Sequence, residues 1–259
     1  MLKKLKYLIR SRSPGFVADH YAAFVPGRVA QLCWHGRTLN YRPGTSDTGV
    51  IHSILLKGGH KDEYAPPKEF THARDRIATV LDIGANIGVS AVYFAHIFPQ
   101  ARVYAFEPMP ENFALLAMNA ADQPRIHAVN CALGAVDGEV EMLASDSATN
   151  FGGFSLHAAG SDASKKRKVP IRNAQAQMDA LGITSVDVIK IDTEGAEWEI
   201  LTALAPGLLR SAKLIMGELH GTRDFALLEY LAPDFCIGMK KNIHSRLFNF
   251  HALRRAHLN

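Results

Sequence analysis

The chain has 259 residues, of which 47% are hydrophobic and 21% are charged. This suits a globular protein with one large α/β domain and a small extra lobe. A net charge of +4 provides no argument for a nucleic-acid partner. Three scattered cysteines exclude a disulfide framework and a zinc motif, and they predict a reducing, cytoplasmic location. The apolar run at the start is too short for a signal sequence or a membrane span, so we expect no stable membrane insertion.

The first 75 residues lack a regular alternation of strands and helices. They carry Pro-Gly pairs at 26–27 and 43–44, and such pairs mark turns. We therefore expect a small N-terminal lobe or cap over 1–75, followed by one larger domain over 76–259.

Strands alternate with helices from residue 76 onward. Residues 78–83 form a continuous apolar run that stops at Gly84, which is typical of a strand buried on both faces. An amphipathic helix follows. Residues 102–106 form the next strand, and a helix over 110–121 begins with proline and glutamate, as first turns often do.

A less regular stretch separates the two halves of this pattern. A third strand is predicted over 126–132, and Asp137-Gly138 gives a hairpin-turn signal between two β-like runs. Residues 144–168 are rich in Ser, Ala, Asp and Gly, with little periodicity. Long loops in compact domains are usually functional or disordered, and we predict a lid or substrate loop here.

The last part of the chain returns to alternation. Further strands are predicted over 186–191, 214–219, 235–239 and 247–251, with helices after the first two. Alternation of this kind implies a mostly parallel, doubly wound α/β sheet.

The segment Val80-Leu-Asp-Ile-Gly-Ala-Asn-Ile-Gly88 is the strongest local signal. A buried strand runs into a glycine turn and then a helix, which directs backbone N–H groups toward one point. Gly84 and Gly88 permit tight turning, and Asn86 is one of the few other residue types that tolerate a left-handed backbone. The next strand ends in Glu107, which can accept both ribose hydroxyls of a nucleoside lying across the strand ends.

The glycine spacing indicates which nucleoside binds. A dinucleotide site has G-x-G-x-x-G, whereas this turn reads G-x-N-x-G with Asp82 just before it. An acidic residue is a poor neighbour for a diphosphate but suits the positive ammonium and sulfonium of S-adenosyl-L-methionine. An NAD(P)-dependent oxidoreductase is the first alternative, because it shares the strand–turn–helix and the ribose acid.

Four motifs, in order along the chain, resemble the FkbM family of methyltransferases. They are VLDIGANIG at 80–88, AFEPMP at 105–110, VNCALG at 129–134 and IKIDTEGAE at 189–197, of which the last is the most specific. The resemblance implies a Rossmann-like class I methyltransferase domain with a seven-stranded sheet and helices on both faces. It also implies S-adenosyl-L-methionine as cofactor and methyl transfer to oxygen on a sugar or natural-product hydroxyl.

The resemblance assigns cofactor contacts residue by residue. The cofactor loop would comprise Asp82, Gly84, Ala85, Asn86 and Gly88, with Glu107 on the ribose and Asn130 near the adenine. Many class I enzymes place an acid where Asn130 stands, so this residue departs from the usual pattern. The stretch NFGGFS at 150–155 resembles the family's Asn/Gly/Ser segment over the cofactor.

An alcohol acceptor becomes a better nucleophile when a base takes its proton. In this fold such a base belongs at the carboxyl ends of the fourth and fifth strands, and the candidates there are Asp192, Glu194, Glu218 and His220. We expect Asp192 beside the transferred methyl group, and the others as base or acceptor-positioning groups. There are alternatives: His220 could be purely structural, and Glu194 and Glu197 could simply favour a helix N-terminus.

Asp192, Glu218 and His220 also have the ligand types of a divalent metal site. Their spacing matches no compact metal signature, and the resemblance requires no ion. We therefore expect no metal.

Two further alternatives stay open. A nucleic-acid methyltransferase usually carries an Asp/Asn-Pro-Pro-aromatic motif where this chain has Asp192-Thr-Glu-Gly195. A non-catalytic cofactor-binding module is compatible with the same motifs. We expect a small-molecule or glycan acceptor and no nucleic acid; the sequence specifies neither the acceptor nor an oligomeric state.

Overall fold

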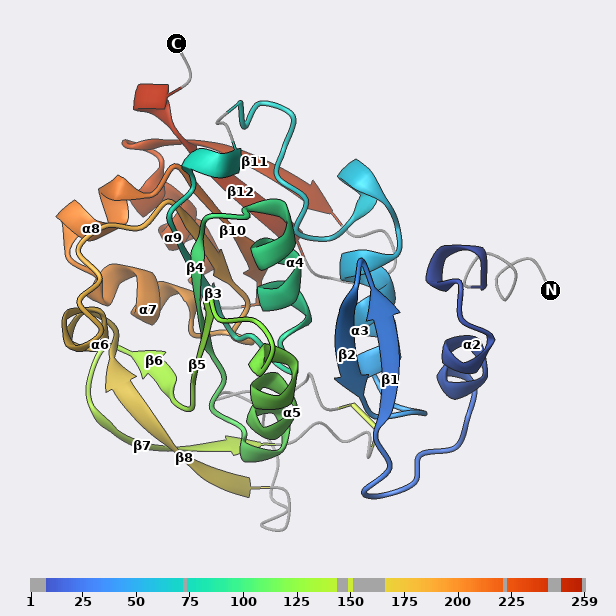
Figure 1. The fold of residues 1–259 in the computed structure, drawn as a ribbon. Coiled ribbons are helices and arrows are strands. Elements are labelled where there is room, and N and C mark those ends of the chain that lie inside the picture. The colour runs from blue at the N-terminus through green and yellow to red at the C-terminus, as the bar shows by residue number, and fades with distance from the viewer. Residues whose placement is uncertain are drawn as a thin grey trace.

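The computed structural model describes residues 8–71, 74–143, 149–150, 166–220, 223–241 and 248–257. Its centre is a seven-stranded sheet (Figure 1). From edge to edge the strands are β11 (Phe235–Lys241), β12 (Phe248–Arg254), β10 (Leu214–Leu219), β9 (Val188–Ile191), β3 (Thr79–Ile83), β4 (Arg102–Phe106) and β5 (Ile126–Val129). Only β12 runs against the others. The predicted mostly parallel sheet is confirmed.

The central strands are apolar along their length because both faces of the sheet are covered. Every residue of β9 is buried. In β3 the alternation of side chains divides the core, since Val80 belongs to the cluster on one face and Leu81 and Ile83 to the cluster on the other. Two charged residues interrupt this apolar pattern, Asp82 in β3 and Lys190 in β9, and both are buried.

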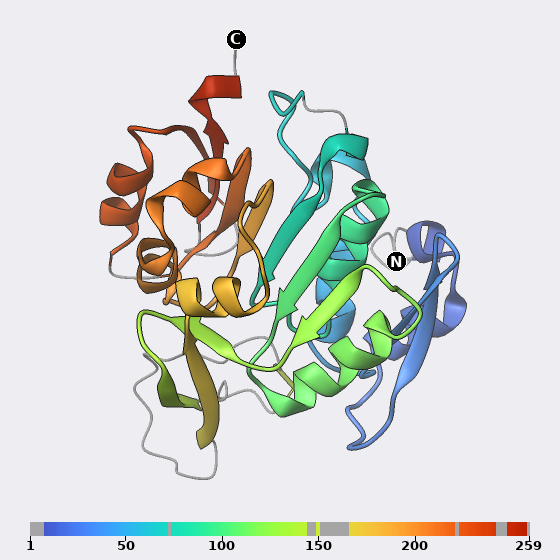
Figure 2. The same cartoon turned by 60° about the vertical axis from the view of Figure 1, so that its left-hand side comes forward.

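Helices cover both faces of the sheet, as Figure 2 shows from the side. On one face lie α4 (Val89–Ile97) and α5 (Pro110–Ala120); on the other lie α6 (Ala174–Ala180), α7 (Glu197–Ala203), α8 (Pro206–Ser211) and α9 (Asp224–Leu231). Among the described residues, none of the helices combines the length and apolar character needed to cross a bilayer.

The N-terminal elements pack outside α4 and α5 (Figure 1). They are α2 (Pro14–His20), the hairpin of β1 (Ala30–Trp34) and β2 (Arg37–Tyr41), and α3 (Asp47–Leu55). Their buried side chains, such as Phe16 and Ile51, belong to the same apolar cluster as Phe94 of α4 and Leu116 of α5. This segment therefore shares one core with the helices of the main sheet.

A second sheet corrects two predictions. The strand predicted over 126–132 ends at Val129, and the chain then enters a three-stranded sheet of order β6 (Ala132–Gly134), β8 (Lys166–Asn173), β7 (Gly138–Leu143). The predicted hairpin at Asp137-Gly138 is wrong, because β8 lies between β6 and β7. Asp137 instead accepts a hydrogen bond from the backbone N–H of Asn173.

The predicted lid is only partly within the described residues. Residues 166–168, expected in the loop, begin strand β8. Residues 144–148 and 151–165 lie outside the described residues, and with them most of the NFGGFS stretch.

Candidate cofactor and catalytic site

The glycine turn after β3 has the backbone conformation that its sequence predicts. Gly84, Asn86 and Gly88 have φ angles of +78°, +51° and +85°. A Cβ atom on Gly84 would lie 1.9 Å from the carbonyl oxygen of Asp192, so the close approach of β9 requires glycine there. The N–H groups of Gly84 and Ala85 donate to the carbonyl of Phe106, which fixes the turn against β4.

Glu107 joins this turn to the loop after β4. Its Oε2 accepts from the backbone N–H of Asn86 at 2.9 Å, and its Oε1 accepts from the N–H of Met109 at 2.9 Å and from Asn112 Nδ2 at 3.5 Å. Burial raises the pKa of Glu107 to about 7, although the hydrogen bonds from Met109 and Asn86 favour the ionised form. The ribose acid predicted from the sequence therefore faces the glycine turn directly.

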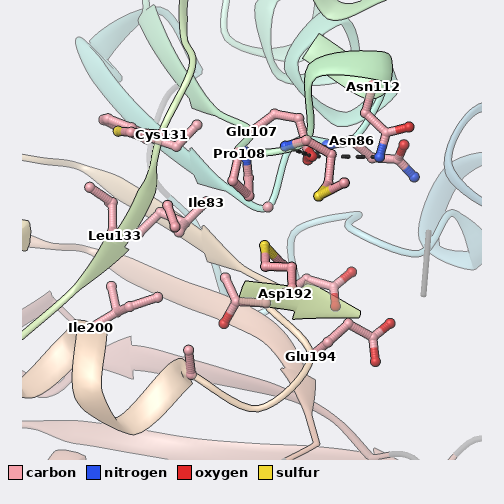
Figure 3. A pocket seen from close by; sticks show the side chains of 17 residues that line it. Ile83, Asn86, Glu107, Pro108, Asn112, Cys131, Leu133, Asp192, Glu194 and Ile200 are labelled. Atoms are coloured by element: carbon pink, nitrogen blue, oxygen red, sulfur yellow. Dashed lines mark hydrogen bonds between the residues drawn. The ribbon is translucent and has the colours of Figure 1, made fainter. Parts of the chain in front are cut away.

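A pocket of about 700 Å³, counting the part open to solvent, lies above these residues. Figure 3 shows Glu107, Asn86 and Asn112 grouped on one wall, with Asp192 and Glu194 across from them. The rest of the lining is largely apolar and includes Ile83, Phe106, Cys131, Leu133, Met142 and Ile200. The Oδ1 atom of Asn86 is buried and has no hydrogen-bond partner among the described residues.

Two predicted cofactor residues support the site without lining it. Asp82 is fully buried and accepts from the hydroxyl of Ser90 at 2.6 Å. Asn130 uses its amide nitrogen to donate to the carbonyls of Glu107 and Pro108, so it holds the loop that carries Glu107. Neither residue lines the pocket.

Lys190 was missed by the sequence analysis. Its Nζ lies 3.3 Å from Asp82 Oδ1 and donates to the carbonyl of Gly84 at 2.6 Å. Burial alone would lower the pKa of Lys190, but the carboxylates of Asp82 and Asp192 outweigh burial and raise it. The sequence carried one sign of it, because a lysine stands inside the otherwise apolar segment Val188-Ile-Lys-Ile191.

A second cavity of about 660 Å³, again partly open, adjoins the first. The two share Gly84, Asn86, Asp192 and Glu194. Its other lining includes Glu63 and Tyr64 from the N-terminal segment and Glu218 from β10. The shared residues therefore lie at the junction between two spaces.

The four predicted catalytic residues come together at this junction. His220 Nε2 lies 3.2 Å from Glu218 Oε2, 3.9 Å from Asp192 Oδ1 and 3.8 Å from Glu194 Oε2. Burial would lower the pKa of His220, but its contacts with Glu197 and Glu218 outweigh burial and raise the pKa to about 11. The hydroxyl of Tyr64, which the sequence analysis did not select, donates to Asp192 Oδ2 at 2.7 Å.

Glu194 and Glu197 have different roles in the turn after β9. Glu194 has a φ angle of +57°, an unusual conformation for a residue other than glycine and one that clusters at functional sites. Burial raises the pKa of its carboxyl to about 7. Glu197 is almost fully buried and accepts from the N–H groups of Thr193 and Gly195, so it organises the turn.

A buried polar chain links the N-terminal segment to Glu107. Arg42 forms a two-pronged ion pair with Asp47, with contacts of 2.8 and 2.9 Å. The same guanidinium donates to Asn112 Oδ1 at 2.8 Å, and Asn112 in turn contacts Glu107.

The fold and this strand-end site define a class I methyltransferase. The chain belongs to the FkbM family, since the family described as "Methyltransferase FkbM domain" matches residues 82–252. The oxidoreductase alternative is therefore not supported.

Named relatives share moderate sequence identity with this chain. Hexuronic acid methyltransferase AglP of Haloferax volcanii is 26% identical over 217 residues, which cover 83% of this chain and 77% of AglP. The 31-O-demethyl-FK506 methyltransferase FkbM of Streptomyces tacrolimicus is 27% identical over 181 residues, covering 59% of this chain and 69% of that protein. The match to AmbE of Pseudomonas aeruginosa spans only 10% of that protein's length, and the match to sdnD of Sordaria araneosa spans 58%.

A crystal structure of a methyltransferase FkbM from Methylobacillus flagellatus has the same fold. It superposes with a TM-score of 0.50 at 19% identity, covering 80% of this chain and 53% of that one.

Proposed function

We propose that this methyltransferase takes its methyl group from S-adenosyl-L-methionine and transfers it to a hydroxyl of a sugar or natural-product small molecule. The proposal rests on one observation: Glu107 and Asn86 line one pocket at the carboxyl edge of β3 and β4, and Oδ1 of Asn86 is buried without a hydrogen-bond partner among the described residues. A buried acceptor without a partner is costly, so a ligand with hydrogen-bond donors fits this place.

The pocket suits the parts of that cofactor. A carboxylate offers about four acceptor positions, and hydrogen bonds from the described residues use three of those on Glu107, which leaves capacity for a ribose hydroxyl. The apolar wall of Phe106, Leu133 and Ile200 can cover an adenine ring. When bound, the cofactor supplies an activated methyl group on a positively charged sulfur.

The junction residues would act on the acceptor. Glu194 would take the hydroxyl proton, because it lines both spaces and burial raises the pKa of its carboxyl to about 7. Asp192 is oriented by Tyr64 and favours positive charge at the junction. The acceptor would lie in the second cavity, next to the shared residues, and such positioning supplies much of the acceleration in an in-line transfer.

Oxygen as the acceptor atom is supported by chemistry and by relatives. Carboxylates accept hydrogen bonds from hydroxyls, and the second cavity has four of them: Glu63, Asp192, Glu194 and Glu218. The names of two relatives refer to a hexuronic acid and to a 31-O-demethyl substrate.

Calorimetry tests the cofactor assignment. The purified chain should bind S-adenosyl-L-methionine and its demethylated product, and Glu107→Ala should weaken both at least about tenfold through loss of a charged hydrogen bond. Glu111→Ala, a glutamate exposed on α5, is the matched control and should bind as the wild type does. No binding of either nucleoside by the wild type would refute the proposal.

The acceptor requires a separate measurement. Mass spectrometry of glycans and metabolites from cells with and without the protein should reveal a product heavier by one CH₂ group. Mild alkali then distinguishes an O-methyl ether, which survives, from a methyl ester, which is hydrolysed. Loss of the added methyl in alkali would contradict transfer to a hydroxyl.

A further inference from the structure

Asp192, Glu218 and His220 each direct a ligand atom toward one region of the junction. Those three atoms all lie within 4.8 Å of one another. The ligands come from adjacent parallel strands, β9 and β10, whose carboxyl ends meet at the same edge of the sheet. The sequence showed no compact metal spacing because this group is assembled by strand pairing rather than along one helix or loop.

The surroundings of His220 supply an independent observation. Its side chain is only 7% exposed, and Nε2 faces the carboxylates while Nδ1 lies 3.5 Å from Glu197 Oε1. That Nδ1 contact lacks hydrogen-bond geometry, and Nδ1 has no hydrogen-bond partner among the described residues. Glu197 Oε1 nevertheless lies within reach of this far nitrogen, where a carboxylate that accepts the N–H would orient a metal-binding histidine.

The local balance of charge also favours a cation. Glu63 and Glu194 lie beside Asp192 and Glu218 on the lining of the second cavity. The ammonium of Lys190 also lines this cavity and offsets part of the negative charge, while it contacts Asp82 and the carbonyl of Gly84. Clustered, partly buried carboxylates repel one another unless a cation is shared among them. In the metal-free protein the imidazolium of His220, whose pKa is raised to about 11, supplies that charge, and a divalent ion would replace the proton on Nε2.

We propose that Asp192, Glu218 and His220 bind a divalent cation of the Mn²⁺ or Mg²⁺ type. Two carboxylate oxygens and one imidazole nitrogen suit such an ion, and water or a substrate oxygen can complete its coordination. Asp192 lines both spaces, so the ion would stand where the acceptor hydroxyl is expected. A divalent ion lowers the pKa of an oxygen bound to it; this catalytic role rests on the proposed function, whereas the site itself does not.

Manganese binding tests the site directly. The full chain, stripped with EDTA, is titrated with MnCl₂, and free Mn²⁺ is followed by electron paramagnetic resonance. We expect a single tight site, weakened at least about tenfold in Glu218→Gln and in His220→Gln. Glu199→Gln, an exposed carboxylate on the neighbouring α7, is the matched control and should bind Mn²⁺ as the wild type does.

Three results would overturn the proposal: no Mn²⁺ binding by the wild type, binding that Glu218→Gln leaves unchanged, or only weak binding at several sites. Thermal melting of each variant without metal checks folding, and Asp192→Asn replaces any variant that does not fold. Added Mn²⁺ should raise the melting temperature of the wild type but not of the ligand variants.

Calorimetry with S-adenosyl-L-methionine, repeated with and without Mn²⁺, separates this inference from the proposed function. Cofactor binding without Mn²⁺ binding would overturn only the metal site. Mn²⁺ binding without cofactor binding would support the metal site while refuting the cofactor assignment.

Discussion

The ammonium of Lys190 donates a 2.6 Å hydrogen bond to the carbonyl oxygen of Gly84, so a strand at the centre of the sheet supports the glycine turn. The same ammonium lies beside the fully buried Asp82. An acid just before the turn and a lysine on the neighbouring strand thus form one buried ion pair.

Replacing Lys190 should reveal the cost of leaving Asp82 without its partner. We expect Lys190→Met to lower the free energy of unfolding by about 3–5 kcal/mol, because a buried charge loses its counter-ion. Urea denaturation measures this loss. Lys213→Met is the control, since Lys213 pairs with Asp187 at 2.7 Å where both side chains are partly exposed, and we expect about 1 kcal/mol or less. Equal losses in the two variants would contradict the supporting role of Lys190.

Gly84→Ala should abolish cofactor binding and destabilise the fold, because its Cβ would overlap the carbonyl oxygen of Asp192. Gly36 has nearly the same φ angle, +76°, and open space around the Cβ position. Gly36→Ala should therefore cost only the conformational penalty of about 1–2 kcal/mol. Thermal melting and calorimetry with S-adenosyl-L-methionine compare the two variants. Normal cofactor binding by Gly84→Ala would contradict the prediction, because it would mean that the backbone after β9 moves to make room for the added Cβ.

Cofactor binding should release a proton near pH 6.5. Burial raises the pKa of Glu107 to about 7, so the Glu107 carboxyl is protonated in much of the unliganded protein at pH 6.5. A ribose hydroxyl, in contrast, donates its hydrogen bond to the ionised carboxylate. Affinity should therefore fall as the pH drops from 8 to 6, by up to about tenfold per unit below the pKa. Calorimetry in buffers of different ionisation enthalpy measures the number of protons released on cofactor binding. Proton uptake instead of release would contradict the prediction.

Tyr64→Phe should remove the hydroxyl that orients Asp192 while keeping the buried ring. Because that hydrogen bond ends on a carboxylate, we expect a loss of about 1–3 kcal/mol in unfolding free energy, together with slower methyl transfer. Tyr93→Phe is the control, since this ring is also buried but its hydroxyl contacts neither Asp192 nor the two cavities. Urea denaturation and initial rates of methyl transfer should show a larger effect for Tyr64→Phe. Equal effects of the two substitutions would contradict the role of Tyr64 in orienting Asp192.

The sequence predicted those parts of the site that depend on local pattern. Buried strands, the glycine turn, Glu107 and the acids at the carboxyl ends of β9 and β10 follow from periodicity and strand-end position. The positions of Lys190 and Tyr64 in the site depend on which distant segments pack together, and a local sequence pattern does not predict that packing. The hairpin prediction was wrong for the same reason. The distant strand β8 pairs between β6 and β7, and the backbone N–H of its residue Asn173 donates to Asp137.

The polar chain from Asp47 through Arg42 and Asn112 to Glu107 has a consequence for building chimeras. A protein that takes its first 75 residues from a relative would place foreign side chains against Asn112 and against the outer faces of α4 and α5. The proposed ribose contact would then change along with the lining of the second cavity, even though Glu107 itself stayed the same. Grafts intended to alter selectivity alone should therefore carry α4 and α5 with the N-terminal segment.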